Sequence, residues 1–418
     1  MEELTELSAT TDPHSVMDQI EHAINGKAYS ELRSRVPLDV RRAKGTFFTS
    51  EVLGEELISL IPQEITLAKT ALDPCCGAGN LLLSYAKKLP VSTTLKDTIE
   101  AWGKVLFGFD TSNELVIATK LRLALLAKQR GRFPSAVENV ETLFPNIFVA
   151  NALKQCEIFG TVDFILLNPP YQSVPAPDWY NFGAGKVSTA ALFVDHVCRH
   201  LGPSTKVFCI LPEVIRCGTR YRKLRENMAE RVSAQSVQAI GVFDSWTDID
   251  VFITELSAKE ENKSVEIFAA QRPNSNFTVN DFFEVKIGPV VAYRSPKEGE
   301  LRPYLETKTT PAWAQKHESR EFRRFSGTVF KPPFVVVRRT SRPGDKYRAI
   351  GTIVRGKYPV AVENHLIVLR PKTGTVKQCK KLLRILKSDA TTQHLDNNMR
   401  CRHLTVKAVK DIPWSQDG

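Results

Sequence analysis

Short apolar runs alternate with stretches of helical periodicity over about the first 260 residues of the chain. Runs of this length and composition are typical of strands that are buried within a sheet. Five of them lie at residues 71–72, 105–109, 147–150, 162–167 and 207–211. Two more, at 236–243 and 251–256, are predicted to pair as neighbours. The alternation predicts an α/β domain whose strands form a parallel sheet.

Helical periodicity occupies most of the intervals between these runs. Residues 14–25 place apolar side chains on one face, with Gly26 suited to end the helix. Thr49 or Ser50 is suited to cap a helix from Glu51 to Leu60. Further helices are predicted at residues 81–86, 113–129, 189–201 and 221–233.

A polar residue follows each of the first four apolar runs. These residues are Asp73, Asp110, Asn151 and Asn168. The carboxyl ends of parallel strands meet at one edge of the sheet, which is where ligands bind in open α/β folds. Four polar groups at one edge are difficult to explain by solubility, so we expect a binding site there.

The first of these strand ends opens a glycine-containing turn, Asp73–Asn80. Gly77 and Gly79 allow the backbone to approach a ligand closely, but no third glycine completes a dinucleotide-binding motif. An acidic residue before the turn suits a ligand with an ammonium group better than a phosphate. Asp110 can accept two hydrogen bonds, as the two ribose hydroxyls of a nucleoside would require.

Asn168-Pro169-Pro170-Tyr171 follows the fourth strand. Two prolines cannot continue a sheet ladder, so the strand must end there. The motif offers an amide, carbonyl acceptors and a flat ring, which suit an exocyclic amine on a planar base. A proline-terminated strand followed by a turn would explain the tetrapeptide without a function. The next segment, 172–186, is predicted to be a long loop, and such loops at a sheet edge are often functional.

Charge is distributed unevenly along the chain. Residues 296–418 hold 26 lysines and arginines against 11 acidic residues, which leaves 31 against 35 for residues 1–295. A C-terminal third with this excess of basic residues is typical of a module that binds nucleic acid. The alternative is a basic surface that only contacts solvent. Strand-like runs at 334–337 and 365–369 and a helical pattern at 377–387 predict a mixed α+β unit. We place the boundary between residues 1–275 and 276–418.

Other features limit the class of protein. No apolar run approaches the roughly 18–20 residues of a membrane span, and the first residues lack the pattern of a signal peptide. None of the eight cysteines has C-x-x-C spacing, so neither a zinc site nor a disulfide framework is indicated. We therefore expect a cytoplasmic protein that holds no metal.

The chain resembles the gamma class of N6-adenine DNA methyltransferases, the TaqI-like type II modification enzymes. The Asn168–Tyr171 motif matches the catalytic signature of that class. Lys44–Ser50 resembles its first cofactor motif, and Asp73–Gly79 resembles its glycine-containing motif. In the gamma class, the cofactor motifs come first along the chain, the catalytic motif follows, and the recognition domain comes last. The resemblance implies a Rossmann-like catalytic domain at 1–275 and a DNA target-recognition domain at 276–418.

The resemblance also implies roles for the residues of the catalytic domain. S-adenosylmethionine would lie across the strand ends, with Asn168, Pro169, Pro170 and Tyr171 as the catalytic motif. Asn151 stands where the family usually has aspartate, yet its carbonyl oxygen can still accept from the adenine amino group. The implied cofactor-binding residues are Thr49, Asp73, Cys75, Gly77, Asp110 and Asn151.

A flipped-out adenine in duplex DNA would be the substrate. The resemblance places Tyr171 on one face of the base and Phe243 on the other. It implies a monomer and, as a further partner, a companion restriction endonuclease. Recognition-domain residues implied to contact DNA are Arg338, Arg339, Arg342, Arg400 and Arg402.

Three alternatives stay open. Asn-Pro-Pro-Tyr also occurs in methyltransferases that act on structured RNA or on a protein glutamine, although those chains usually lack a basic C-terminal domain of this size. N4-cytosine methylation is possible, although serine in place of Asn168 is its commoner sign. A catalytically idle DNA-binding protein that retains the fold is the third alternative, and Asn151 gives it slight support.

Overall fold

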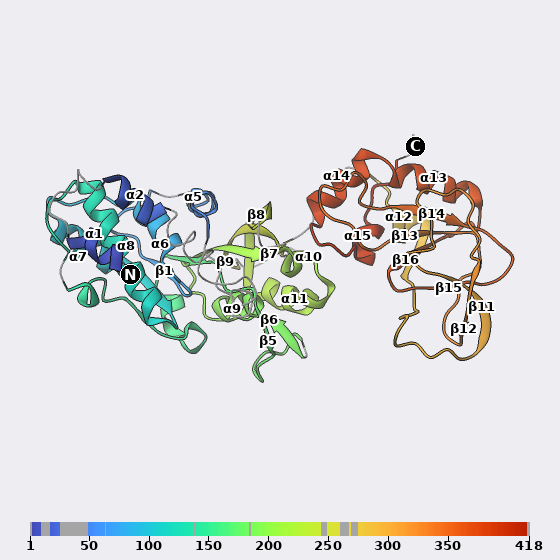
Figure 1. Cartoon of the computed structure of the whole chain (residues 1–418), viewed down its shortest axis with the longest axis horizontal. Helices are drawn as coiled ribbons and strands as arrows, with labels where there is room; N and C mark the ends of the chain where they lie inside the picture. The colour runs from blue at the N-terminus through green and yellow to red at the C-terminus, as the bar shows by residue number, and fades with distance from the viewer. Residues whose placement is uncertain are drawn as a thin grey trace. The chain divides into compact units, whose positions relative to one another are not determined.

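The structure is a computed structural model of the chain that describes residues 2–9, 17–25, 49–62, 64–137, 139–183, 185–243, 249–259, 267–268 and 275–415. Two compact units are formed, and Figure 1 labels their elements. The N-terminal unit comprises Met1–Arg216 and Arg220–Phe268, and the C-terminal unit comprises Cys217–Thr219 and Ala269–Gly418. Of the expected cofactor segment Lys44–Ser50, residues 44–48 lie outside the described residues.

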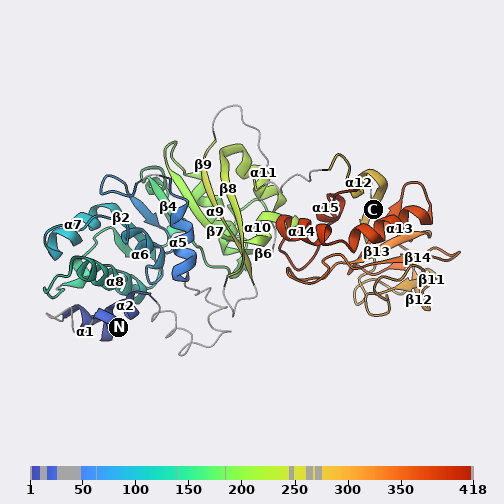
Figure 2. The ribbon, with the colours of Figure 1, turned by 90° about the horizontal axis from the view of Figure 1, so that it is seen from above.

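A seven-stranded sheet with the order β3-β2-β1-β4-β7-β9-β8 forms the centre of the N-terminal unit. The first five strands in that order are parallel, while β9 pairs antiparallel with both β7 and β8. Figure 2 shows β7, β8 and β9 side by side. The strands are β1 (Ala71–Asp73), β2 (Leu106–Asp110), β3 (Ile147–Val149), β4 (Phe164–Leu167), β7 (Lys206–Pro212), β8 (Val232–Val242) and β9 (Asp250–Ala258). The α/β fold with a mainly parallel sheet is confirmed.

Helices cover both faces of this sheet. Their bounds are α1 (Glu2–Ala9), α2 (Met17–Asn25), α5 (Glu51–Ser59), α6 (Asn80–Ala86), α7 (Leu95–Val105), α8 (Asn113–Gly131), α9 (Thr189–Arg199), α10 (Glu213–Cys217) and α11 (Arg222–Arg231). Short 3₁₀ turns are η1 (Val140–Thr142), η2 (Ala152–Lys154), η3 (Glu157–Gly160) and η4 (Thr219–Tyr221). Among the described helices, none is long and apolar enough to cross a membrane.

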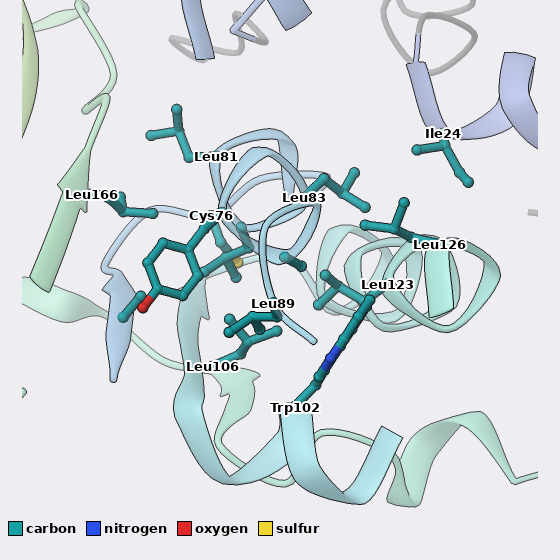
Figure 3. Close-up of a cluster of buried hydrophobic side chains, with 14 of the residues drawn as sticks. Ile24, Cys76, Leu81, Leu83, Leu89, Trp102, Leu106, Leu123, Leu126 and Leu166 are labelled. Carbon is teal, nitrogen blue, oxygen red and sulfur yellow. The ribbon is translucent and has the colours of Figure 1, made fainter. Parts of the chain in front are cut away.

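Strand β4 divides the core into two layers. Phe164 and Leu166 pack in the cluster that contains α5, α6, α7 and α8, whereas Ile165 and Leu167 pack in the cluster that contains α9 and α11. Figure 3 shows the first layer, where Trp102 lies with Leu106 and the leucines of α6 and α8. Burying a side chain such as Leu166 stabilises the fold by roughly 1.5–3 kcal/mol. Both faces of the strand are therefore apolar, and its polar groups are confined to its end.

Two expectations about local structure differ from the structure. The helix α7 was missed, and Val105 ends this helix instead of starting a strand. The segment 172–186 is partly a hairpin of β5 (Ser173–Pro175) and β6 (Lys186–Ser188). Strand β7 ends at Pro212, opposite Val251. This proline lies beyond the residues that pair with β4, so its missing N–H breaks no bond to β4. The capped helix was correct, with Ser50 accepting from the Leu53 N–H at 3.3 Å.

The C-terminal unit is a mixed α+β structure. Its antiparallel sheet has the order β10-β16-β13-β14, and a three-stranded sheet has the order β12-β11-β15. The strands are β10 (Phe283–Ile287), β11 (Glu300–Leu305), β12 (Glu321–Phe325), β13 (Phe334–Arg338), β14 (Gly351–Val354), β15 (Ala361–Val362) and β16 (Leu366–Pro371). The helices are α12 (Val279–Phe282), α13 (Val376–Leu386), α14 (Asp389–Asn398) and α15 (Val406–Lys410). The predicted helix and both predicted strands of this unit are present.

Candidate active site at the carboxyl edge of the sheet

The strand order reverses between β1 and β4. The chain adds β2 and β3 on one side of β1, then returns to place β4 on the other side. Asp73 ends β1, and Asn168 directly follows β4. The two residues therefore lie at the switch point of the sheet, where diverging connections open a crevice for ligands.

The turn after β1 is fixed against the end of β2. The Gly77 N–H donates to Asp110 Oδ2 at 3.0 Å, and the Cys75 N–H donates to Asp73 Oδ1 at 3.0 Å. Gly79 has a φ of +86°, and a Cβ there would lie 2.8 Å from Thr119 Cγ2. The second glycine is thus required both by its left-handed conformation and by the close approach of α8.

Two carboxyl groups lie buried or half-buried beside this turn. Asp73 is 2% exposed, and burial raises its pKa to about 7, with a smaller contribution from the neighbouring Asp110. Burial also raises the pKa of Asp110. Among the described residues no cationic side chain pairs with either group. A buried acid without a cationic partner favours the approach of a positively charged ligand group.

Asn168 is held from both sides of its amide group. Its Nδ2 donates to Thr49 Oγ1 at 2.7 Å, and its Oδ1 accepts from the Tyr171 hydroxyl at 2.7 Å. Cys75 Sγ donates to the Asn168 carbonyl oxygen at 3.4 Å, and burial raises the pKa of this thiol so that it keeps its proton. The amide orientation is therefore determined, and one lone pair of Oδ1 remains for a ligand.

The rings of Tyr171 and Phe243 contact each other. Their centroids are 5.6 Å apart and their planes meet at 80°, an edge-to-face arrangement. Phe243 is buried, and burial raises the pKa of Tyr171 well above its usual value. The structure brings together the two residues that the sequence suggested for base stacking, but as a closed pair rather than as parallel planes.

Asn151 lies at the same edge but apart from this network. It is exposed, and its Oδ1 accepts from the Leu153 N–H at 3.0 Å, which caps η2. Sequence reasoning missed two contacts that organise the site. The Asn80 amide donates to the Thr49 carbonyl oxygen, and Thr119 Oγ1 donates to the Gly77 carbonyl oxygen at 2.8 Å. Neither contact has a sequence signal, because the partners are 31 and 42 residues apart.

The predicted DNA-binding arginines form two adjacent segments of the C-terminal unit. The Leu404 N–H donates to the Arg339 carbonyl at 2.8 Å, and the Ser341 N–H donates to the Arg402 carbonyl at 2.9 Å. Residues 338–342 and 400–404 therefore run side by side. The side chains of Arg342 and Arg402 are exposed, those of Arg339 and Arg400 are half-buried, and half-buried Arg338 donates to the Thr310 carbonyl at 2.9 Å.

Comparison with known proteins gives one family match. A family model described as N-6 DNA Methylase matches residues 21–281. No curated protein sequence matches the chain.

Solved structures match the fold at low sequence identity. The type IIL restriction-modification enzyme MmeI, solved in complex with DNA, is 12% identical, with a TM-score of 0.52 over 95% of this chain and 69% of that chain. A putative class I S-adenosylmethionine-dependent methyltransferase from Listeria monocytogenes is 16% identical, with a TM-score of 0.39 over 58% of this chain and 70% of that chain. A modification subunit of a putative type I restriction enzyme from Vibrio vulnificus YJ016 is 16% identical, with a TM-score of 0.38 over 56% of this chain. The chain spans 52% of that subunit.

Proposed function

Because the chain belongs to the N-6 DNA methylase family, we propose that it transfers a methyl group from S-adenosylmethionine to N6 of an adenine in duplex DNA. The observation that carries the proposal is the fixed amide of Asn168 beside the buried acids Asp73 and Asp110 at the switch point. These groups suit the two reactants of such a transfer, an amine on a flat base and a cationic cofactor.

The residues present fit S-adenosylmethionine. Asp73 is a buried carboxyl group without a cationic partner among the described residues, which suits the ammonium of a methionine moiety. Asp110 accepts two backbone N–H groups and retains lone pairs for hydroxyl groups. Gly77 has no side chain, so a ligand can lie against the backbone of the turn at this residue. When bound, this cofactor supplies an electrophilic methyl group on a sulfonium.

The role of Asn168 in the proposed reaction is electrostatic. The exocyclic amine of adenine is a weak nucleophile because its lone pair is delocalised into the ring. Asn168 Oδ1 and the Pro169 carbonyl oxygen would each accept one amine hydrogen and so favour a tetrahedral nitrogen with a localised lone pair. Because the Thr49 hydroxyl accepts from its nitrogen, the amide keeps its orientation and needs little reorganisation in the transition state.

A target base needs the Tyr171–Phe243 contact to open. The two rings meet edge to face at 5.6 Å, so a base cannot lie between them in this arrangement. We propose that Tyr171 turns to stack on the base and releases Asn168 Oδ1 as it does so. The same movement would then admit the base to the side of Asn168 Oδ1, which accepts from the amine.

The C-terminal unit would bind the duplex through the adjacent segments 338–342 and 400–404. We also propose that the chain is a modification enzyme with a companion endonuclease. This proposal rests on the fold that it shares with the restriction-modification enzyme MmeI. We propose that it acts as a monomer in the cytoplasm.

The test is methyl transfer from labelled S-adenosylmethionine to duplex DNA, with modified-base sequencing of DNA from cells that express the chain. We expect N6-methyladenine at one short recognition sequence. The variant Asn168→Ala should lose at least about 100-fold in methyl transfer, as removal of one preorganised polar group does in other enzymes, while DNA binding is retained. Asn113→Ala, an exposed residue of α8, is the control.

Transfer to RNA or to a protein in parallel reactions, with none to DNA, would move the proposal to another substrate class. Near wild-type turnover in Asn168→Ala would contradict the assigned role. Failure of the wild-type chain to bind S-adenosylmethionine in calorimetry would favour an idle DNA-binding protein.

A further inference from the structure

Cys156, His196 and His200 converge on one point of the N-terminal unit, and none of them is assigned to methyl transfer. Their sulfur and ring nitrogen ligand atoms all lie within 4.8 Å of one another. Cys156 lies between η2 and η3, whereas the two histidines lie at the end of α9, four residues apart and so on the same helical face. We propose that these three residues bind one zinc ion, with the fourth position taken by water.

A backbone carbonyl fixes each imidazole ring. His196 Nε2 is 2.6 Å from the Gln155 carbonyl oxygen, and His200 Nδ1 is 2.8 Å from the His196 carbonyl oxygen. A carbonyl oxygen only accepts, so these nitrogens carry the hydrogen. In a neutral ring the other nitrogen then holds a free lone pair. A backbone carbonyl that fixes the ring in this way is the usual partner of a histidine that binds a metal.

One side of the cluster packs against the protein interior, and the other side is exposed to solvent. His196 is buried with its ring 5.5 Å from the ring of Phe159, while His200 is partly exposed and Cys156 is exposed. The nearby charge of Arg199 is compensated, because its guanidinium donates to Asp195 at 2.8 and 3.0 Å. An ion can therefore enter from solvent, and the charge of Arg199 does not oppose it.

The donor set selects the kind of metal. One thiolate and two imidazoles suit zinc and other borderline or soft ions, whereas magnesium and calcium need oxygen ligands. Metal binding releases the thiol proton of Cys156 to solvent, and the resulting thiolate compensates one positive charge of the ion. The ion would join the segment after β3 to the helix that follows Asn168–Tyr171.

The experiment uses the full chain after treatment with a chelator and dialysis. Titration with zinc chloride, followed by calorimetry, should give one ion per chain and raise the melting temperature. Cobalt(II) in place of zinc should give a sulfur-to-cobalt charge-transfer band in the near ultraviolet. These readouts do not depend on methyl transfer, so they are independent of the proposed function.

Cys156→Ser and His200→Gln should each weaken zinc binding by about 100-fold or more, since losing even an outer partner of a metal ligand costs about 10- to 100-fold. The serine variant should also lose the cobalt band. His22→Gln, an exposed histidine of α2, is the matched control and should bind as the wild type does. Because Cys156 is exposed, its serine variant should fold, which circular dichroism verifies.

Absence of stoichiometric zinc binding by the wild-type chain would overturn the inference. Zinc affinity unchanged in folded Cys156→Ser, or a cobalt complex without the sulfur band, would overturn it equally. Binding that is lost in Cys156→Ser and His200→Gln but kept in His22→Gln would support it.

Discussion

At the scale of single residues, the site depends on side chains that fix the orientation of the Asn168 amide. Thr49 accepts from the Asn168 amide nitrogen, and Tyr171 donates to the Asn168 oxygen. Asparagine has no charge to fix its orientation, so its two ends are distinguished only by these partners. The hydroxyl of Thr49 therefore acts as a positioning group, in addition to any contact that it makes with the cofactor.

The variants Thr49→Val and Thr49→Ser separate these two roles. Valine removes the acceptor for Asn168 and should lower kcat by about 100-fold, since a misplacement of about 1 Å can cost this much. Serine retains the hydroxyl and should stay near wild-type kcat. Steady-state kinetics combined with calorimetry for the cofactor gives the distinction. A weaker affinity for S-adenosylmethionine with unchanged kcat would assign Thr49 to the cofactor instead.

In its proposed role, Asp73 should make cofactor binding depend on pH. Its pKa is raised to about 7 by burial, and a cationic group beside it favours the ionised form. Below pH 7 the proton must leave before the ammonium binds, so affinity should fall by up to about tenfold for each pH unit. Calorimetry from pH 5.5 to 8 measures the slope, and two buffers of different ionisation enthalpy reveal the released proton. Affinity independent of pH would contradict this role.

The same raised pKa affects the stability of the free chain. The folded state holds the Asp73 proton more tightly than the unfolded state does, so this contribution to stability is fully present below the ordinary value of 3.8. It is lost as pH rises through about 7. In Asp73→Asn the pH dependence of both stability and cofactor affinity that stems from this group should disappear.

At the scale of elements, α8 joins the N-terminal helices to the glycine turn. Buried Arg122 donates through Nε to the Ala23 carbonyl at 3.3 Å and through Nη2 to the Ile24 carbonyl. Its Nη1 donates to the Ala78 carbonyl and to Asn80 Oδ1. The carbonyls at the end of α2, which no helical N–H can reach, thus obtain partners from another helix.

Arg122→Met should lower the free energy of unfolding by at least about 2 kcal/mol, because each buried acceptor that loses its partner costs roughly 1–3 kcal/mol. Urea denaturation followed by circular dichroism measures the change. Arg132→Met at the end of the same helix is the control, since the Arg132 side chain is exposed. Its cost should stay below about 1 kcal/mol. Equal losses in both variants would contradict the special role of Arg122.

The elements that the sequence predicted are those whose pattern is local. The runs before Asp73, Asp110 and Asn168 are apolar and end in a polar residue, so the strands and their edge could be anticipated. The hairpin of β5 and β6 was missed because its strands have only three residues each, too few for a period.

Contacts across the chain could not be predicted in the same way. The Asn168–Thr49 bond joins residues 119 positions apart, and the convergence of Cys156 with the two histidines depends on how α9 packs. The resemblance supplied candidate residues for the site, but it did not supply the closed Tyr171–Phe243 pair.

At the scale of the whole molecule, the net charge of +11 is concentrated in the C-terminal third. Each lysine or arginine that contacts a phosphate releases counterions, so DNA affinity should fall steeply with salt. In Arg342→Ala/Arg402→Ala the slope of log affinity against log salt should decrease by about 2, or about 1 for each arginine that no longer reaches a phosphate. Fluorescence anisotropy with labelled duplex DNA gives the slope.

Lys96→Ala on α7 removes an exposed charge of the N-terminal unit and is the control. It should leave the salt slope unchanged. If the arginine double variant also retained the wild-type slope, the segments 338–342 and 400–404 would not face the phosphates.

The pairing of β4 with β1 also determines when the N-terminal unit can fold during synthesis. Cys75 and Asn168 meet across 93 residues of intervening chain, and β1 has no neighbour on that side until β4 has been made. Parallel pairing across such a distance is slow to form because the loop must close first. During synthesis on the ribosome, methyl transfer can therefore begin only after β4 and its successors have emerged. A nascent chain that stops short of β4 would contain the glycine turn but no catalytic motif. Methyl transfer would therefore be a measure of complete folding of the N-terminal unit.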